Sequence, residues 1–249
     1  MGQMLEQQRN LLIKLRELKL TGFAEMLEAQ FNNFNVYAHS TFEERLTLCL
    51  DAQEDMIKQR RYVNLIKQAK LKDKLTFNDI MKKPSAGLTS QLIQSLTSNA
   101  WISSAQNIII QGPTGVGKTA LCCAIGFNVC KSQKSVYYTR TADLIELLNN
   151  QTGYHAKNRL IQKLSKVNVL ILDEFGSSRP SGCSILDLSK IIDNREGVVP
   201  TILATQLKIS ALIDFLGGDH LAEGILDRLI HPSIQIKLEG ESRRKDYMS

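Results

Sequence analysis

An eight-residue segment, Gly112 to Thr119, has the residue types and spacing that bind nucleotide phosphates. It reads GPTGVGKT and fits the pattern G-x-x-x-x-G-K-[ST] in full. It follows the apolar run NIII and precedes an apolar stretch with helical character, which is the context that the motif requires. The glycines let backbone N–H groups turn toward the phosphates, and the N-terminus of the following helix adds partial positive charge. The segment therefore predicts a phosphate-binding loop.

Within this loop, Lys118 is expected to reach the β- and γ-phosphates, and the Thr119 hydroxyl is expected to ligate Mg²⁺. The predicted nucleotide-binding residues are Gly112, Pro113, Thr114, Gly115, Val116, Gly117, Lys118, Thr119 and Ala120.

Two adjacent carboxylates, Asp173 and Glu174, end the apolar run VLIL. Such a run predicts a buried strand that delivers both acids to the C-terminal edge of a parallel sheet, where ligands bind. Asp173 is expected to hold Mg²⁺, directly or through water, and Glu174 is expected to polarise the attacking water. Because most GTPases lack this pair of adjacent acids, we expect the nucleotide to be ATP.

A third apolar run, TILA, ends in Thr205 and Gln206. If its strand lies between the strands of the first two motifs, one of these side chains faces the γ-phosphate. An ordinary polar strand end explains them equally well, so both interpretations stay open. Arg228 and Arg244 are candidates for an arginine that stabilises charge on the γ-phosphate, although a surface position is the simpler explanation for any single arginine.

The elements that must position these residues divide the chain near residues 84–100. Before this point, periodic apolar residues predict helices only, one of them opening at Ser40 with Glu43 as a capping box and running to about Lys70. After it, short β-rich runs alternate with helices, which indicates an α/β domain with a largely parallel sheet. We expect a helical domain over residues 1–83 and an ATPase domain over residues 84–249. The expected strands cover residues 107–111, 135–139, 167–173, 201–205 and 233–238.

The net charge of +6 favours an anionic partner only mildly, but the basic residues are unevenly distributed. Nine basic residues and two acidic residues lie between Ile57 and Lys83. A solvated helix face and a surface that contacts nucleic-acid phosphates both explain this run. The candidate nucleic-acid contacts are Lys58, Arg60, Arg61, Lys67, Lys70, Lys72 and Lys74.

Composition excludes several other classes of protein. Hydrophobic residues make up 43% of the chain and charged residues 22%, which is typical of a globular protein. The five cysteines are odd in number and lack CxxC spacing, so neither a disulfide framework nor a zinc site is expected, and Cys122, Cys123 and Cys130 are expected to pack in a core. Because no apolar run approaches the roughly 18 residues that span a bilayer, we expect a cytoplasmic protein with no membrane partner.

Taken in order, these motifs resemble the IstB-type ATPases, AAA+ proteins that assist transposition and are related to the DnaC and DnaI helicase loaders. The resemblance rests on the phosphate-binding loop, on LILDEFG, ATQL, LAEGILDRLIH and LEGESRRK, and on the N-terminal stretches LKLTGFAEMLEAQ and TFEERLTLCLDAQ. The chain departs from the family pattern at Ala120, often His, at the Asp-Glu pair, often Asp-Asp, and at Arg243, commonly Met. Asp-Glu is the more usual pair in AAA+ proteins and favours hydrolysis.

The resemblance implies a three-layer P-loop AAA+ domain with a parallel sheet, preceded by a small all-α domain. It implies an ATP- and Mg²⁺-dependent homo-oligomer with nucleotide at its subunit interfaces. This oligomer would bind double-stranded DNA with little sequence preference, be stimulated by it, and direct a transposase to its target. The resemblance assigns Arg228 as an arginine finger acting on the neighbouring subunit, Arg244 as a sensor arginine of the same subunit, and Gln206 as the strand-end sensor.

Two other functions remain open. A replicative helicase loader would use the same ATPase core to place a helicase on single-stranded DNA. A nucleotide switch would bind ATP without hydrolysing it, although the intact Lys118, Asp173 and Glu174 count against this function.

Overall fold

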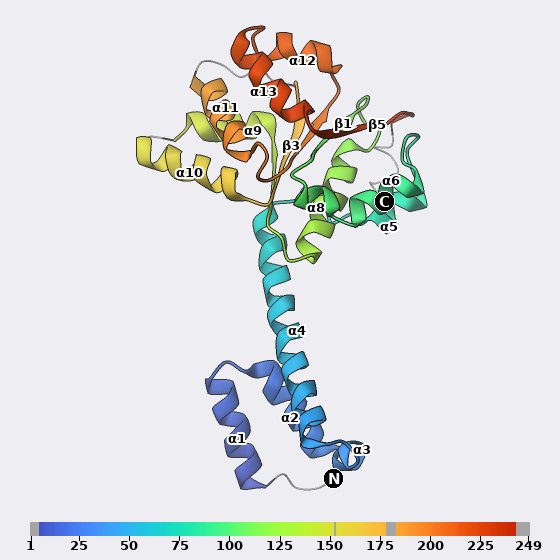
Figure 1. The fold of residues 1–249 in the computed structure, drawn as a ribbon, viewed down its shortest axis with the longest axis vertical. Helices are drawn as coiled ribbons and strands as arrows, with labels where there is room; N and C mark the ends of the chain where they lie inside the picture. Colours follow the sequence, from blue (N-terminus) through green and yellow to red (C-terminus); the bar gives the residue numbers. More distant parts are fainter. Residues whose placement is uncertain (1–4, 152, 178–182, 243–249) are drawn as a thin grey trace. The chain divides into compact units, whose positions relative to one another are not determined.

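The computed structural model describes residues 5–151, 153–177 and 183–242 and divides into two compact units, Met1–Asn64 and Leu65–Ser249 (Figure 1). The division falls within helix α4 (Phe42–Ala69), earlier in the chain than the expected boundary between residues 83 and 84. The intervening residues pack with the sheet domain, because the short helix α5 (Phe77–Lys82) contacts helix α8 (Lys118–Lys131). The predicted boundary rested on turn-forming residues, which are a local feature of the sequence. The observed boundary depends on contacts between α5 and α8, which are far apart in the chain.

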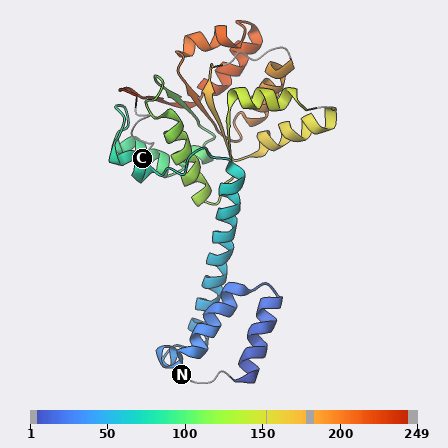
Figure 2. The same ribbon diagram turned by 180° about the vertical axis from the view of Figure 1, so that it is seen from behind.

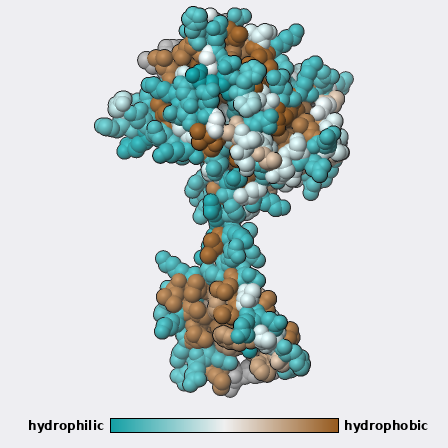
Figure 3. Space-filling model, in the orientation of Figure 1, coloured by the Kyte–Doolittle hydropathy of each residue, from teal (hydrophilic) through white to brown (hydrophobic). Residues whose placement is uncertain are grey.

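The N-terminal unit is helical, as the apolar periodicity predicted. It contains α1 (Glu6–Glu17), α2 (Thr21–Asn32), α3 (Phe34–Tyr37) and the first part of α4. Its core includes Leu12, Ala24 and Cys49, together with the buried Gln30, whose side-chain amide donates a hydrogen bond to the backbone carbonyl of Arg45 at 2.9 Å. Large hydrophobic side chains are also exposed on this unit, and they form much of its visible surface (Figure 3).

The capping box of α4 lies one residue later than predicted. The Glu44 amide donates to the Thr41 hydroxyl at 3.2 Å, and the Thr41 amide donates to the Glu44 carboxylate at 2.8 Å. The prediction at Ser40 and Glu43 was therefore wrong. Ser40 and Thr41 are each followed three residues later by Glu, so the sequence contains two overlapping capping patterns.

The second unit is built on a five-stranded parallel sheet with the strand order β2-β3-β4-β1-β5. The strands are β1 (Asn107–Gln111), β2 (Val136–Arg140), β3 (Val169–Phe175), β4 (Thr201–Thr205) and β5 (Ser233–Lys237). All five were predicted, β1 and β4 with these bounds and the others within two residues at either end. The strand β4 lies between β1 and β3. This is the arrangement in which Thr205 or Gln206 was expected to face the γ-phosphate.

Helices cover both faces of this sheet and give three layers (Figures 1 and 2). On one face, α8 packs against β2, β3 and β4. On the other, Ile109, Tyr137 and Leu170 share a core with the helices listed next. These helices are α9 (Thr141–Asn149), α10 (Tyr154–Lys166), α11 (Cys183–Arg195), α12 (Ile209–Leu216) and α13 (His220–Ile230). The predicted fold class is confirmed: a three-layer AAA+ domain that is preceded in the sequence by a small helical domain.

The connection from α4 to β1 also carries the short helices α6 (Ser90–Thr97) and α7 (Ala100–Ser103). Cys122, Cys123 and Cys130 are buried in α8, as predicted. No helix in the described part of the chain is long and apolar enough to cross a membrane.

Candidate active site

A pocket of about 730 Å³ brings most of the predicted site residues together at the C-terminal ends of the strands. It joins the phosphate-binding loop, the ends of β2 and β3, the residue after β4 and a segment that follows α4. Its lining residues are Lys72, Asp73, Lys74, Leu75, Thr114, Gly115, Gly117, Lys118, Thr119, Ala120, Arg140, Asp173, Glu174 and Gln206.

The loop between β1 and α8 has the backbone conformation that the motif predicts. Gly117 is the N-cap of α8 with a φ of 108°, which a residue with a side chain rarely adopts. The first backbone N–H groups of α8 therefore begin at the pocket, where a helix N-terminus favours an anion. The Lys118 side chain is buried, and its ammonium group donates to the carbonyls of Gly112 at 2.7 Å and Pro113 at 2.8 Å.

Asp173 is buried near the C-terminal end of β3, and its carboxylate accepts three hydrogen bonds. Its Oδ2 accepts from the Thr119 hydroxyl and from the Tyr138 hydroxyl, each at 2.7 Å, and its Oδ1 accepts from the Glu174 amide at 2.8 Å. The two predicted metal ligands, Thr119 and Asp173, are therefore in direct contact. A hydroxyl and a carboxylate are hard oxygen donors of the kind that Mg²⁺ prefers.

Glu174 owes its position to a β-bulge. The pairing of β3 with β4 shifts between Leu172 and Phe175, and Glu174 has a φ of 53°. Successive side chains of a regular strand point to opposite faces, but a bulge re-aims them, so both Asp173 and Glu174 line the pocket. The Glu174 carboxylate also lies 3.6 Å from the Arg140 guanidinium at the end of β2.

The structure separates the two polar residues that end β4. Thr205 is fully buried, and its hydroxyl accepts a hydrogen bond from the Leu207 amide at 3.1 Å. Gln206 lines the pocket, and its side-chain carbonyl accepts from the Thr114 hydroxyl at 2.6 Å. Of Thr205 and Gln206, it is therefore Gln206 that faces the phosphate-binding loop.

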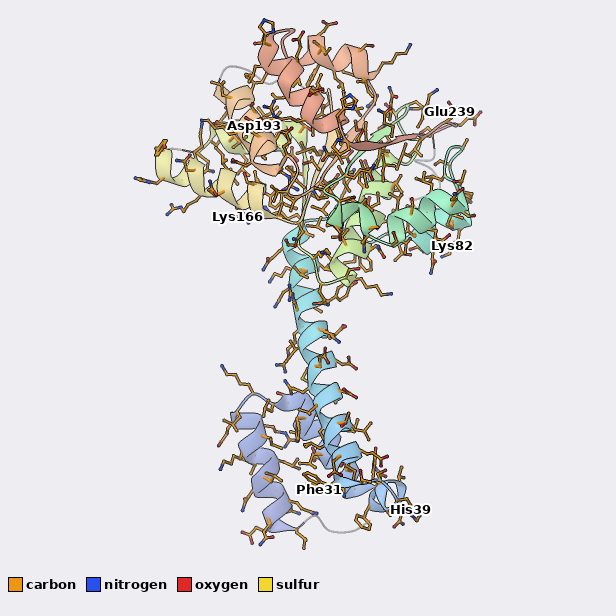
Figure 4. The ribbon with its side chains drawn as sticks, viewed as in Figure 1. Phe31, His39, Lys82, Lys166, Asp193 and Glu239 are labelled. Carbon is orange, nitrogen blue, oxygen red and sulfur yellow. The ribbon has the colours of Figure 1, made fainter. Side chains whose placement is uncertain are left out.

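Arg228 does not line the pocket of its own chain. It lies on α13, where its guanidinium pairs with Asp193 of α11 at 3.1 Å and with Glu196 at 2.9 Å (Asp193 is labelled in Figure 4). Its Nη1 also donates to the carbonyl of Gly224 at 2.9 Å. Arg244, the predicted sensor arginine, lies outside the described residues, as does Arg243.

The predicted basic run is divided between the two units. Lys58, Arg60 and Arg61 belong to the N-terminal unit, whereas the remaining four lie in the sheet domain. Of these four, Lys72 and Lys74 line the pocket, and the Lys70 ammonium group lies 5.4 Å from the centre of the Tyr137 ring. Lys67 lies on α4 and does not line the pocket.

Sequence reasoning missed Tyr138, Arg140 and the segment Lys72–Leu75. Arg140 ends the strand next to β3, so its place at the C-terminal sheet edge was a usable signal. Tyr138 lies in the middle of that strand, and only the folded sheet shows that its hydroxyl reaches Asp173. For Lys72–Leu75 the sequence carries no such signal, because only the packing of this segment brings it to the pocket.

A parallel sheet with a phosphate-binding loop after one strand and an acid pair at the end of another defines a P-loop nucleotide-binding domain of the AAA+ class. Residues 13–249 match the model of the family described as IstB-like ATP binding protein, and the chain belongs to this family. The predicted resemblance is therefore confirmed.

Relatives within the family come from bacterial insertion sequences. The chain is 39% identical over 201 residues to a protein of Pseudomonas fluorescens named as an ATP-binding protein of insertion sequence IS1162, with 80% of this chain and 86% of the relative covered. It is 33% identical over 233 residues to the insertion sequence ATP-binding protein y4pL of Sinorhizobium fredii, with 94% and 95% covered.

Solved structures share the fold at lower identity. The crystal structure of DnaI aligns with a TM-score of 0.55 at 20% identity, covering 66% of this chain and 89% of DnaI. AMPPCP-bound DnaA from Aquifex aeolicus aligns with a TM-score of 0.56 at 19% identity, covering 71% of this chain and 53% of DnaA. The DnaC helicase loader aligns with a TM-score of 0.50 at 20% identity, covering 72% of this chain and 99% of DnaC.

Proposed function

We propose that this protein is an ATPase that assists DNA transposition, oligomerising on double-stranded DNA and directing a transposase to target DNA. The observation that carries the ATPase activity is the contact between Thr119 and Asp173, with Lys118 and Glu174 lining the same pocket. Membership of the IstB-like family and relatives named after insertion sequences support the role in transposition.

In this proposal, Lys118 and the backbone N–H groups at the start of α8 bind the phosphates of ATP. Thr119 and Asp173 hold Mg²⁺, which neutralises phosphate charge when bound. The described residues contain no group of three or more His, Cys, Asp or Glu side chains able to hold a metal ion. This agrees with Mg²⁺, which takes most of its ligands from phosphates and water rather than from a protein cage.

Glu174 orients the attacking water and accepts its proton, and Gln206 contacts the γ-phosphate or that water. Arg228 of the neighbouring subunit and Arg244 of the same subunit stabilise the charge that develops on the γ-phosphate. Because Arg228 pairs with Asp193 and Glu196 of its own chain, assembly must bring it to the neighbouring pocket.

The variant Glu174→Gln tests the catalytic base. Its ATP affinity should stay within about twofold of the parent, since the amide keeps the shape of the side chain, while kcat should fall about 100-fold or more. Fluorescent-ATP binding and phosphate release measure the two quantities. Glu146→Gln, an exposed residue of α9, is the matched control and should retain full activity. Turnover at the parental rate in Glu174→Gln would remove Glu174 as the base.

The DNA-binding part of the proposal concerns Lys58, Arg60 and Arg61 on α4. Binding to a random-sequence DNA duplex should be tight only with ATP, because it depends on the assembled state. Charge reversal at these positions should weaken binding at all sequences and flatten its dependence on salt concentration. Titrations with ATP, with ADP and without nucleotide measure both effects.

Either of two results would contradict this part. Unchanged affinity in the charge-reversed variants would exclude the three residues as phosphate contacts. Weak duplex binding in all nucleotide states, with a preference for single strands, would instead support the helicase-loader function.

A further inference from the structure

The wall of the nucleotide pocket contains a segment that belongs to none of the motifs, Lys72–Leu75. It lies between α4, which ends at Ala69, and α5, which begins at Phe77. Two of its four side chains carry positive charge, and both were predicted to contact nucleic acid. Their position in this pocket raises a different possibility for the anion that they bind, namely the phosphates of a nucleotide.

Three contacts anchor the residues around this segment to the sheet domain. Lys70 follows the last residue of α4, has a φ of 55°, and its ammonium group lies over the Tyr137 ring. Leu71 packs so closely on α8 that a Cβ added at Gly126 would lie 2.7 Å from its Cδ2. The backbone of Asp73 and of Lys72 approaches the Cys123 thiol of α8 and favours its charged form, which lowers the pKa of this thiol against the effect of burial.

Cys123 also shows which side of the pocket the segment occupies. It lies one helical turn after Thr119, on the same face of α8. Burial raises the pKa of its thiol, and the nearby carboxylates of Asp73 and Asp173 raise this pKa further. The segment and Asp173 also line the same pocket, so Lys72–Leu75 shares this cavity with the carboxylate proposed to hold Mg²⁺.

The charges on this side of the pocket suit a polyphosphate. Lys72 and Lys74 are solvent-exposed, and within the described residues neither ammonium group forms an ion pair. Together with Lys118 they add three ammonium groups to the pocket. An ammonium group binds phosphate oxygens through charge-assisted hydrogen bonds, and its flexible stem lets it follow the anion.

We propose that Lys72 and Lys74 bind the terminal phosphates of the bound nucleoside triphosphate, so that the segment after α4 distinguishes ATP from ADP. This inference rests on the proposed ATPase function. In this proposal, the segment after α4 binds the γ-phosphate directly. The first part of α4 belongs to the N-terminal unit, so this segment would link that helix to the state of the nucleotide. In this proposal, Lys72 and Lys74 contact the nucleotide. They are therefore removed from the candidate DNA contacts, which leaves the other basic residues of that set.

The experiment compares the affinities of the full-length double variant Lys72→Gln/Lys74→Gln for a non-hydrolysable ATP analogue and for ADP, both with Mg²⁺. We expect its affinity for the ATP analogue to fall about tenfold or more, with a much smaller loss for ADP, because ADP lacks the γ-phosphate. Lys67→Gln removes the same charge from α4, outside the pocket, and should change either affinity less than about twofold. The variant Lys72→Arg/Lys74→Arg retains the charges and should recover much of the selectivity.

The possible outcomes separate this inference from the proposed function. Equal changes in ATP and ADP affinity, or no change, would overturn the inference, and so would loss of duplex binding without any loss of ATP affinity. Retained ADP binding shows that the double variant is folded, and the arginine variant provides the test if it is not. In parallel, Lys118→Ala should lose both nucleotides, and full binding by that variant would count against the proposed function itself.

Discussion

Asp173 has both of its carboxylate oxygens held by neighbouring groups, and the least expected of these is the Tyr138 hydroxyl. Burial raises the pKa of Tyr138, and the adjacent Asp173 carboxylate raises it further. The phenol therefore stays protonated at neutral pH and donates a hydrogen bond to the Asp173 carboxylate. In the proposed site, a fixed donor of this kind would orient the Asp173 carboxylate without touching the metal.

Tyr138→Phe tests this positioning role. Removing the hydroxyl should weaken Mg²⁺ binding to the ATP complex about tenfold, because one of the groups that orient Asp173 is lost. A Mg²⁺ titration of fluorescent-ATP binding measures the effect, and ATP affinity without Mg²⁺ should not change. Tyr154→Phe, a well-exposed tyrosine of α10, is the matched control. An unaltered Mg²⁺ dependence in Tyr138→Phe would leave the hydroxyl with a structural role only.

At the scale of the elements, Arg195 joins the ends of two helices to the start of β4. It is the last residue of α11, and its guanidinium donates to the carbonyls of Leu164 at 2.7 Å, Val167 at 2.8 Å and Pro200, and to the Thr201 hydroxyl at 3.0 Å. Burial lowers the pKa of Arg195 to about 9, so the group is still charged at neutral pH. The charge is satisfied by carbonyl dipoles.

Replacing Arg195 with Met should destabilise the sheet domain by about 3 kcal/mol, since it leaves buried carbonyl groups without their donors. Urea unfolding followed by the fluorescence of Trp101, the single tryptophan and a buried residue of this domain, measures the change. The exposed Arg159→Met is the control and should stay within about 0.5 kcal/mol of the parent. Equal stabilities would mean that packing alone holds these helix ends.

The elements were largely predictable from the sequence, because an apolar run bounded by turn residues specifies a buried strand locally. The runs before Gly112 and through Asp173 specified β1 and β3 in this way. The bulge at Glu174 was not predictable, since it depends on how β3 pairs with β4. The boundary within α4 was missed for a similar reason, because a continuous helix carries no local sign that its two ends pack in different units.

At the scale of the whole molecule, the proposed subunit interface makes a prediction about mixtures. Lys118→Ala and Arg228→Ala should each lose most ATPase activity when alone. Mixed, they should regain a fraction of it, because a neighbour with intact Arg228 can complete the intact pocket of the Arg228→Ala subunit. Phosphate release measured over a range of mixing ratios, with DNA present, provides the test. An inactive mixture that still assembles would mean that Arg228 does not act between subunits.

The strand order has a consequence for synthesis of the chain on the ribosome. β1, which leads into the phosphate-binding loop, pairs with β4 and β5, and both of these strands are made after residue 200. At about 5–20 residues per second, β1 waits several seconds with both edges unpaired. Its three consecutive isoleucines have the high β-propensity and lack of charge that are typical of segments prone to aggregate while unpaired. The strand on which nucleotide binding depends is therefore among the last to be secured in the nascent protein, and a chain interrupted before β4 would have no sheet in which to hold it.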